Sequence, residues 1–229
     1  AFGLRTLGRL AGRLRAWCGP LKAEPIAILT WHQLFDPPTG VKAPAQNVAP
    51  RRFEDQLAGL QRRGYRFWSL NRLIRAANEG ERPPARTLVV TFDDGYAPVN
   101  VRSILEILVT EKVKATFFIN GYYLSRDPQL WREVAAAGFP VGNHTYYHQD
   151  IRTLTQAELK RELRMTSSAW KTVTGGGLIP YFRPPYGAYD ASSANAVAGF
   201  VNQVPRRAFD APGRRVTVTA GTMWRKRGF

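Results

Sequence analysis

The chain has 229 residues, 44% of them hydrophobic, and a formal net charge of +16 at pH 7. That length and apolar content predict one globular domain with a full core and exclude a disordered chain. No apolar run approaches the roughly 18 residues that cross a bilayer. The lone cysteine, Cys18, excludes an internal disulfide and a cysteine-built zinc site.

The positive charge is concentrated at the two ends of the chain. Residues 1–25 carry five basic groups and one acidic group, and residues 205–229 carry seven and one, so ten of the sixteen net charges lie there. A nucleic-acid-binding domain would carry its charge on the folded face, so we expect no nucleic acid partner. We expect a basic N-terminal segment over 1–25, a folded domain over 26–204 and a basic, poorly ordered tail over 205–229.

Residues 2–17 have a basic amphipathic pattern, with four leucines and a tryptophan on one helical face and arginines around it. Such a pattern suits an anionic membrane surface, so peripheral membrane contact through 1–25 is one expectation. A leader remnant or a helix packed on the domain is the alternative. The segment lacks the continuous apolar centre of a secretory signal.

The central span alternates predicted strands and helices. We expect strands at 26–31, 66–69, 87–90, 115–119 and 139–143. We expect helices at 51–63, 70–78, 99–111, 129–137 and 155–173. The last helix should open with a capping box over 155–158, and 33–50 reads as a proline-rich loop. This alternation predicts parallel βα units in an α/β fold, and six or seven such units predict a closed or distorted barrel.

The strand predicted at 87–90 leads into the stretch Thr91-Phe92-Asp93-Asp94-Gly95. Gly95 permits a sharp turn, so both carboxylates could reach one cleft. Two anions at a strand end cost energy unless a cation or a proton lies between them. The alternative is a solvated Asp-Asp-Gly turn, because turns favour these residue types.

His144 and His148 stand four residues apart, so on a helical turn their imidazoles would share one face. Two histidines at this spacing are a recurring half of a zinc site, although an isolated pair is more often two surface or core histidines. Together with a strand-end aspartate they would supply three ligands and leave one position open, which is the pattern of a catalytic site.

Five reactive side chains directly follow predicted strands. They are Asp93, Asp94, His32, His144 and Arg183. In a parallel βα barrel all such positions lie on the same rim, where active sites are built. Solvated loops would scatter these residues over both rims, so their placement favours an enzyme.

Three stretches carry a family resemblance: Thr91-Phe92-Asp93-Asp94-Gly95, His144-Thr145-Tyr146-Tyr147-His148 and Arg183-Pro184-Pro185-Tyr186-Gly187. In this order they resemble the first three motifs of the polysaccharide deacetylases, the NodB-homology domain of carbohydrate esterase family 4. The resemblance covers roughly residues 26–200. It implies a distorted seven-stranded (β/α) barrel of the NodB-homology type. It also implies a metal-dependent hydrolase that removes N-acetyl groups from N-acetylglucosamine-containing polysaccharide, in the cell envelope or outside the cell.

The resemblance implies a role for each matching residue. Asp94, His144 and His148 would hold one divalent metal ion, zinc in the first place and cobalt or nickel as alternatives. Asp93 would be the catalytic base, oriented by Arg183. The two neighbouring aspartates would therefore have different partners: Asp94 would bind the metal ion with the histidines, and Asp93 would be held by Arg183.

The third motif would serve the substrate. By the resemblance, the backbone N–H of Tyr186 would help to stabilise the oxyanion, and Pro184 and Tyr186 would contact the substrate. Trp31 is a further candidate for stacking on a sugar ring. Taken singly, each of these aromatic residues is more often an ordinary packing residue than a sugar-binding one.

The family's last motif, Leu-x-His-Asp, supplies a general acid, and no histidine follows Tyr186. Either the acid was lost with the C-terminus, or it lies elsewhere. The stretch Ile28-Leu29-Thr30-Trp31-His32 resembles that motif moved to the front, as in the circularly permuted poly-β-1,6-N-acetylglucosamine deacetylases. We therefore predict His32 as the acid, with a structural histidine as the alternative. The family's fourth motif has no clear counterpart.

Two other function classes stay open on the sequence alone. The missing fourth motif and the basic C-terminal end are consistent with a carbohydrate-binding remnant that has lost catalysis. The net charge of +16 is consistent with a binder of nucleic acid or of membrane surfaces, although the charge lies mostly at the ends. Chitin oligomers, peptidoglycan and β-1,6-linked glucosamine all present the same acetamide, so the sequence leaves the polymer open.

Overall fold

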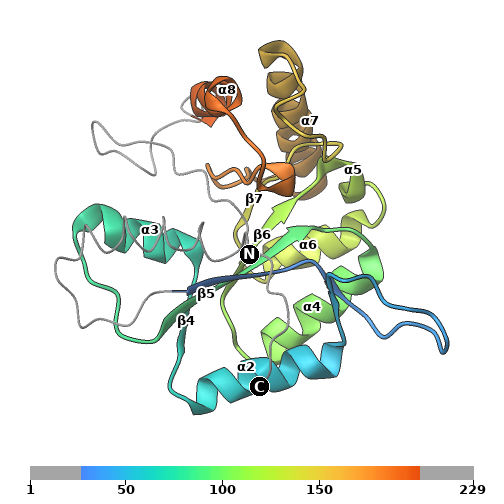
Figure 1. Cartoon of the computed structure of the whole chain (residues 1–229), viewed down its shortest axis with the longest axis vertical. Coiled ribbons are helices and arrows are strands. Elements are labelled where there is room, and N and C mark those ends of the chain that lie inside the picture. The colour runs from blue at the N-terminus through green and yellow to red at the C-terminus, as the bar shows by residue number, and fades with distance from the viewer. Residues whose placement is uncertain (1–26, 202–229) are drawn as a thin grey trace. The chain divides into compact units, whose positions relative to one another are not determined.

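The computed structural model describes residues 27–201 (Figure 1). The predicted segments at 1–25 and 205–229 lie outside the described residues. The described chain divides into two compact units, one of residues 27–92 and 99–116 and one of residues 93–98 and 117–201. No helix within 27–201 is both long and apolar enough to span a bilayer.

The first unit is built on three parallel strands. The central strand is β5 (Thr87–Asp94), and β1 (Ala27–Trp31) and β4 (Arg66–Trp68) both pair with it in parallel. Seven successive residues of β5 are buried, as expected for a parallel strand covered on both faces. The strand runs further than predicted because Trp31 of β1 still pairs with Phe92.

Three helices and two very short strands complete the first unit. The helices are α2 (Pro50–Arg62), α3 (Leu70–Glu79) and α4 (Pro98–Thr110), which agree with the predicted ones within one residue at each end. The predicted loop 33–50 contains β2 (Gln33–Leu34) and β3 (Asn47–Val48), which pair in parallel. A run of two residues is too short for any hydrophobic period to reveal it.

The second unit contains the remaining elements. They are β6 (Ala115–Ile119), whose last three residues belong to this unit, α5 (Gly121–Leu124), α6 (Pro128–Ala136), β7 (Val141–Asn143), α7 (Gln156–Thr174), the 3-10 turn η1 (Pro185–Gly187) and α8 (Ala191–Val201). Strands β6 and β7 are parallel, and Asn143 at the end of β7 forms a further parallel bridge with Phe182. Helix α7 packs against α5, α6 and α8 (Figure 1).

The pairings β1–β5, β4–β5, β2–β3 and β6–β7 are all parallel, and so is the bridge between Asn143 and Phe182. This confirms the predicted α/β fold with βα units, while closure of the sheet into a seven-stranded barrel stays a prediction. The turn α5 and the helix α8 were not predicted. One helical turn carries too little periodicity to be recognised, and α8 is rich in alanine and serine, so its apolar stripe is weak.

The predicted capping box at the start of α7 is present. The Thr155 hydroxyl accepts the Glu158 N–H at 3.3 Å, and the Glu158 carboxylate accepts the Thr155 N–H at 2.8 Å. The hydrogen bonds from the Thr155 hydroxyl and backbone lower the pKa of Glu158. The charged form of Glu158 is therefore the one that stabilises the fold.

We expect Thr155→Ala to lower the free energy of unfolding by about 1 kcal/mol at pH 7, since the cap is lost. Because the folded-state pKa of Glu158 is lowered, its share of the stabilisation is present at neutral pH. That share is lost as the pH falls through this pKa. Urea unfolding of both proteins at pH 7 and near pH 3 measures the effect. An equal difference at the two pH values would contradict the role given to the carboxylate.

Candidate active site

The two aspartates at the end of β5 face different partners. Asp93 is buried, and its carboxylate is hydrogen-bonded to the guanidinium of Arg183, which is also buried. The Arg183 guanidinium carbon lies 4.2 Å from the centre of the Phe118 ring. A charge in such a setting is tolerated only when it is paired. Arg183 therefore holds Asp93 in one orientation.

Asp94 turns the chain and reaches the two histidines. Its backbone has φ = +74°, a conformation that aspartate tolerates better than most residues. One oxygen of its carboxylate lies 3.3 Å from Nε2 of His144 and 3.3 Å from Nε2 of His148. The turn that we assigned to Gly95 thus begins one residue earlier.

The three side chains fit a metal ion. Their ligand atoms all lie within 4.8 Å of one another. Two ligand atoms that each lie about 2.1 Å from one tetrahedral ion are about 3.4 Å apart, which is close to the 3.3 Å between Asp94 and each histidine. One carboxylate and two imidazoles leave a fourth position open, as catalytic zinc sites do.

The backbone fixes which nitrogen of His144 is available. Nδ1 lies 2.6 Å from the carbonyl oxygen of Arg183. A carbonyl can only accept a hydrogen bond, so Nδ1 carries a proton, and Nε2, which faces Asp94, is the nitrogen left to bind a metal ion. Metal-binding histidines are usually oriented in this way by a second hydrogen bond. Arg183 thus serves both carboxylates: its side chain holds Asp93, and its carbonyl orients the ring opposite Asp94.

The helical turn that we predicted for the two histidines is wrong. Residues 144–148 form no helix, and Thr145 and His148 have φ of +67° and +57°. These two, with Asp94 and Tyr186, are four of the six non-glycine residues with positive φ found within 27–201. Such strained positions gather at functional sites. The histidines meet because the loop folds back on itself.

Side chains around the loop hold it in this shape. The Glu162 carboxylate accepts the backbone N–H groups of Tyr146 and Tyr147 at 2.9 and 2.8 Å, and Glu162 is itself buried. The side-chain oxygen of Asn143 accepts the Thr145 N–H at 2.9 Å, and its amide donates to the backbone of α7 at 2.9 Å. These are the contacts that bring the second imidazole to the first.

Our reasoning from the sequence missed Glu162. A signal was available, because the buried face of α7 consists of Leu159, Glu162, Leu163, Thr166 and Trp170. A glutamate at a core-facing position of an amphipathic helix needs a partner. The backbone N–H groups of Tyr146 and Tyr147, in the loop 144–148 that we call the histidine loop, are that partner.

The remaining predicted residues are distributed as follows. Tyr186 is 72% exposed, and its ring centre lies 4.6 Å from that of His148, while Pro184 is buried. Trp31 belongs to the first unit and packs edge-on against Phe53, with ring centres 5.1 Å apart. His32 directly follows β1, as predicted. The roles given to these four residues stay predictions.

The comparison with protein families decides what kind of chain this is. A model of the Polysaccharide deacetylase family matches residues 80–201, more than half of the chain. The chain belongs to the polysaccharide deacetylase family. The match contains Asp93, Asp94, His144, His148 and Arg183, so the cluster described above lies within the family domain.

Curated members of the family are similar over part of their length. A chitooligosaccharide deacetylase of Bradyrhizobium is 35% identical over 124 residues, which are 53% of this chain and 57% of that protein. The peptidoglycan-N-acetylmuramic acid deacetylase PdaA of Bacillus subtilis is 32% identical over 104 residues, 45% of this chain and 40% of that one. The chain thus spans about half the length of these relatives.

Solved structures of the family share the fold. The Streptococcus pyogenes deacetylase PplD, solved in complex with acetate, superimposes with a TM-score of 0.67 at 22% identity, over 76% of this chain and 80% of that one. A de-N-acetylase from Aggregatibacter actinomycetemcomitans gives 0.65 at 18% identity, over 76% and 84%. At this identity the likeness concerns the fold alone, and it supports the NodB-type α/β architecture.

Loss of the Glu162 carboxylate should loosen the metal site of this family member. Glu162→Ala leaves the backbone N–H groups of Tyr146 and Tyr147 without their acceptor, and a hydrogen bond is typically worth about 0.5–1.5 kcal/mol, so we expect lower stability and weaker zinc binding. Glu162→Gln keeps one acceptor oxygen and should retain more of both. Thermal unfolding and zinc titration measure the two effects. Wild-type zinc affinity in Glu162→Ala would show that the loop holds its shape without this contact.

Proposed function

We propose that this chain is a metal-dependent hydrolase that removes N-acetyl groups from an N-acetylglucosamine-containing polysaccharide. The observation that carries the proposal is the cluster of Asp94, His144 and His148, next to a buried Asp93 that is paired with Arg183. We propose zinc as the ion, because one carboxylate and two imidazoles suit it, with cobalt or nickel as substitutes.

Each residue of the cluster has a distinct task in this reaction. A divalent ion held by Asp94 and the two histidines would polarise the acetamide carbonyl and lower the pKa of a water molecule. Asp93 accepts the proton of the attacking water. Arg183 keeps the Asp93 carboxylate in one orientation for this transfer. The backbone N–H of Tyr186 donates to the oxyanion, a contribution typically worth about 10²–10³ in rate.

We propose His32 as the acid that protonates the leaving amine. The support is the strand register: β1 ends at Trp31, which pairs with Phe92 of β5. His32 is the residue after Trp31, and Asp93 is the residue after Phe92. In α/β barrels, catalytic residues lie at the C-terminal ends of the parallel strands. His32 and Asp93, each directly after a paired strand residue, agree with this rule. We thereby also propose that the family's last motif stands at the front of this chain, at residues 28–32, in a circularly permuted order.

Acetate release tests the function directly. The chain is incubated with an N-acetylglucosamine pentamer after treatment with a chelator, then with zinc or cobalt restored. We expect release with the ion, none with the chelator and recovery on restoration. The same assay on acetylated chitin, peptidoglycan and β-1,6-linked polymer identifies the substrate. No release from any of them with zinc bound would favour a carbohydrate-binding remnant.

His32→Ala should retain metal binding and lose turnover by about 10²–10⁴, the usual value of one positioned proton transfer. His32 is not part of the cluster that could hold the ion, so zinc titration should be unchanged. Acetate release and zinc affinity are measured on the same preparation. A fully active His32→Ala enzyme would end the proposal that the last motif has moved to the front.

A further inference from the structure

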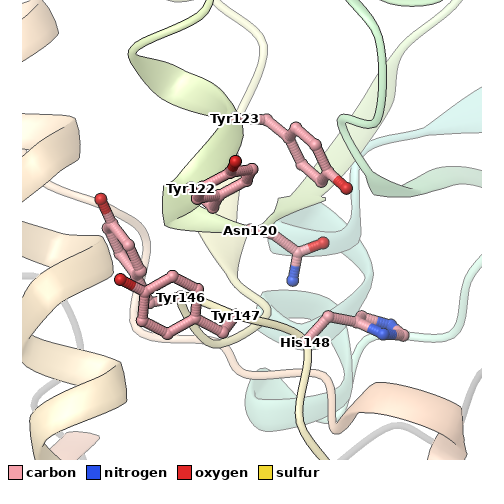
Figure 2. A pocket seen from close by; sticks show the side chains of 6 residues that line it. All are labelled: Asn120, Tyr122, Tyr123, Tyr146, Tyr147 and His148. Carbon is pink, nitrogen blue, oxygen red and sulfur yellow. The ribbon is translucent and has the colours of Figure 1, made fainter.

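A small pocket adjoins the cluster formed by Asp94, His144 and His148, which we call the ligand cluster. Of the residues that take part in the proposed reaction, His148 is the one that lines this pocket. It has a volume of about 190 Å³ and is lined by Asn120, Tyr122, Tyr123, Tyr146, Tyr147 and His148 (Figure 2). We call it the tyrosine pocket. Pockets for drug-sized ligands measure about 300–1,000 Å³, so the tyrosine pocket has room for a single ring rather than a chain.

The tyrosines come from two segments that are hydrogen-bonded to each other. Tyr122 and Tyr123 belong to α5, and Tyr146 and Tyr147 lie between the two histidines (Figure 2). The N–H of Tyr122 donates to the carbonyl of Tyr146 at 3.2 Å, and the N–H of Gly121 donates to that of Thr145 at 3.1 Å. The ring centres of Tyr122 and Tyr147 lie 5.9 Å apart.

The pocket walls are fixed before any ligand binds. Glu162 holds the backbone N–H groups of Tyr146 and Tyr147. A Cβ at Gly121 would lie 2.9 Å from the backbone of Thr166, so α5 packs against α7 without room for a side chain. Preorganised aromatic walls bind a ligand with little loss of conformational entropy.

The pocket is built for a neutral, amphipathic ring. Tyrosine, asparagine and histidine line it, and no lysine, arginine, aspartate or glutamate is among the lining residues. Tyr122 and Tyr147 are 39% and 56% exposed, so their rings are accessible. A pyranose offers an apolar face to such rings and hydroxyls to their polar groups.

We propose that the tyrosine pocket binds the sugar ring next to the one that loses its acetyl group. This inference rests on the proposed function. The pocket adjoins the proposed reaction site because His148 belongs both to the pocket wall and to the group of ligands for the metal ion. A sugar ring bound in the pocket would hold the neighbouring acetylated ring beside Asp94, His144 and His148. The chain would therefore favour oligomers over a single N-acetylglucosamine.

Binding to the metal-free protein tests the pocket separately from catalysis. The full chain is titrated with an N-acetylglucosamine pentamer, β-1,4- or β-1,6-linked, and with N-acetylglucosamine alone, by calorimetry. We expect the wild type to bind at least one pentamer more tightly than the monosaccharide. Tyr147→Ala should weaken that binding about tenfold, the size of one lost aromatic contact. Tyr147→Phe should keep most of it.

Tyr189→Ala is the matched control, because Tyr189 is 49% exposed in the same unit and does not line the pocket. It should bind like the wild type. Equal affinity of Tyr147→Ala and wild type, or no pentamer binding by the wild type, overturns the pocket proposal even if acetate is released. Pentamer binding that depends on Tyr147, without acetate release, sustains the pocket and rejects the proposed hydrolase.

Discussion

Replacing Asp94 is expected to abolish metal binding and acetate release together. Its carboxylate is 3.3 Å from both histidine Nε2 atoms and supplies the only negative charge of the three-residue cluster. Loss of a partner outside the ligand shell commonly weakens metal binding 10–100-fold, and loss of a charged ligand should exceed that. Without the ion, the two imidazoles do not suffice to activate the amide.

Two variants of Asp94 distinguish the loss of the carboxylate ligand from the effect of backbone strain. Asp94→Ala removes the oxygen atoms but also places alanine at φ = +74°, which is strained. Asp94→Asn keeps the shape and tolerates that φ, and should lose the metal all the same. Cobalt titration followed by visible absorption measures the affinity, with the exposed Asp55→Ala as control. Wild-type cobalt affinity in Asp94→Asn would remove this residue from the ligand set.

Replacing Asp93 with asparagine is expected to give the opposite pattern, with the metal retained and turnover reduced by about 10²–10⁴. Asp93 is paired with Arg183 and lies outside the three-residue cluster. Its carboxylate can accept a proton, and an amide cannot. The substitution also leaves the buried Arg183 guanidinium without its counter-charge, which costs up to about 3–5 kcal/mol of stability.

Three measurements on Asp93→Asn distinguish these effects. Cobalt affinity reports whether the cluster is intact, chemical unfolding reports the stability loss, and acetate release on metal-loaded protein reports the chemistry. We expect unchanged affinity, lower stability and little release. Normal turnover in Asp93→Asn would assign the base to another group, while loss of cobalt binding would show that the buried pair with Arg183 builds the metal site.

Local signals were sufficient for the parts of the fold that depend on local physics. The buried strand at Thr87, the helix at Pro50 and the capping box at Thr155 are each specified by neighbouring residues. Parallel pairing followed from the alternation of strands and helices. The expectation that a strand-end aspartate meets the two histidines also followed, because strand ends gather at one edge of a parallel sheet, whereas the choice of Asp94 over Asp93 came from the family resemblance.

The shape of the histidine loop could not be read in the same way. Spacing of four residues predicts a shared helical face, yet positive φ at Thr145 and His148 brings the rings together without a helix. Glu162 of α7, 16 and 15 residues away from Tyr146 and Tyr147 in sequence, accepts the backbone N–H groups of both residues in this loop. Tertiary hydrogen bonds of this kind leave no local periodicity in the sequence.

A crystal of the zinc-loaded chain, measured at the zinc absorption edge, tests the central claim most directly. We predict one anomalous peak bonded to Asp94, His144 and His148 at about 2.0–2.2 Å, with Asp93 beside it and still paired with Arg183. A zinc ion bound elsewhere, or a cluster that stays without zinc at saturating concentration, would contradict the account.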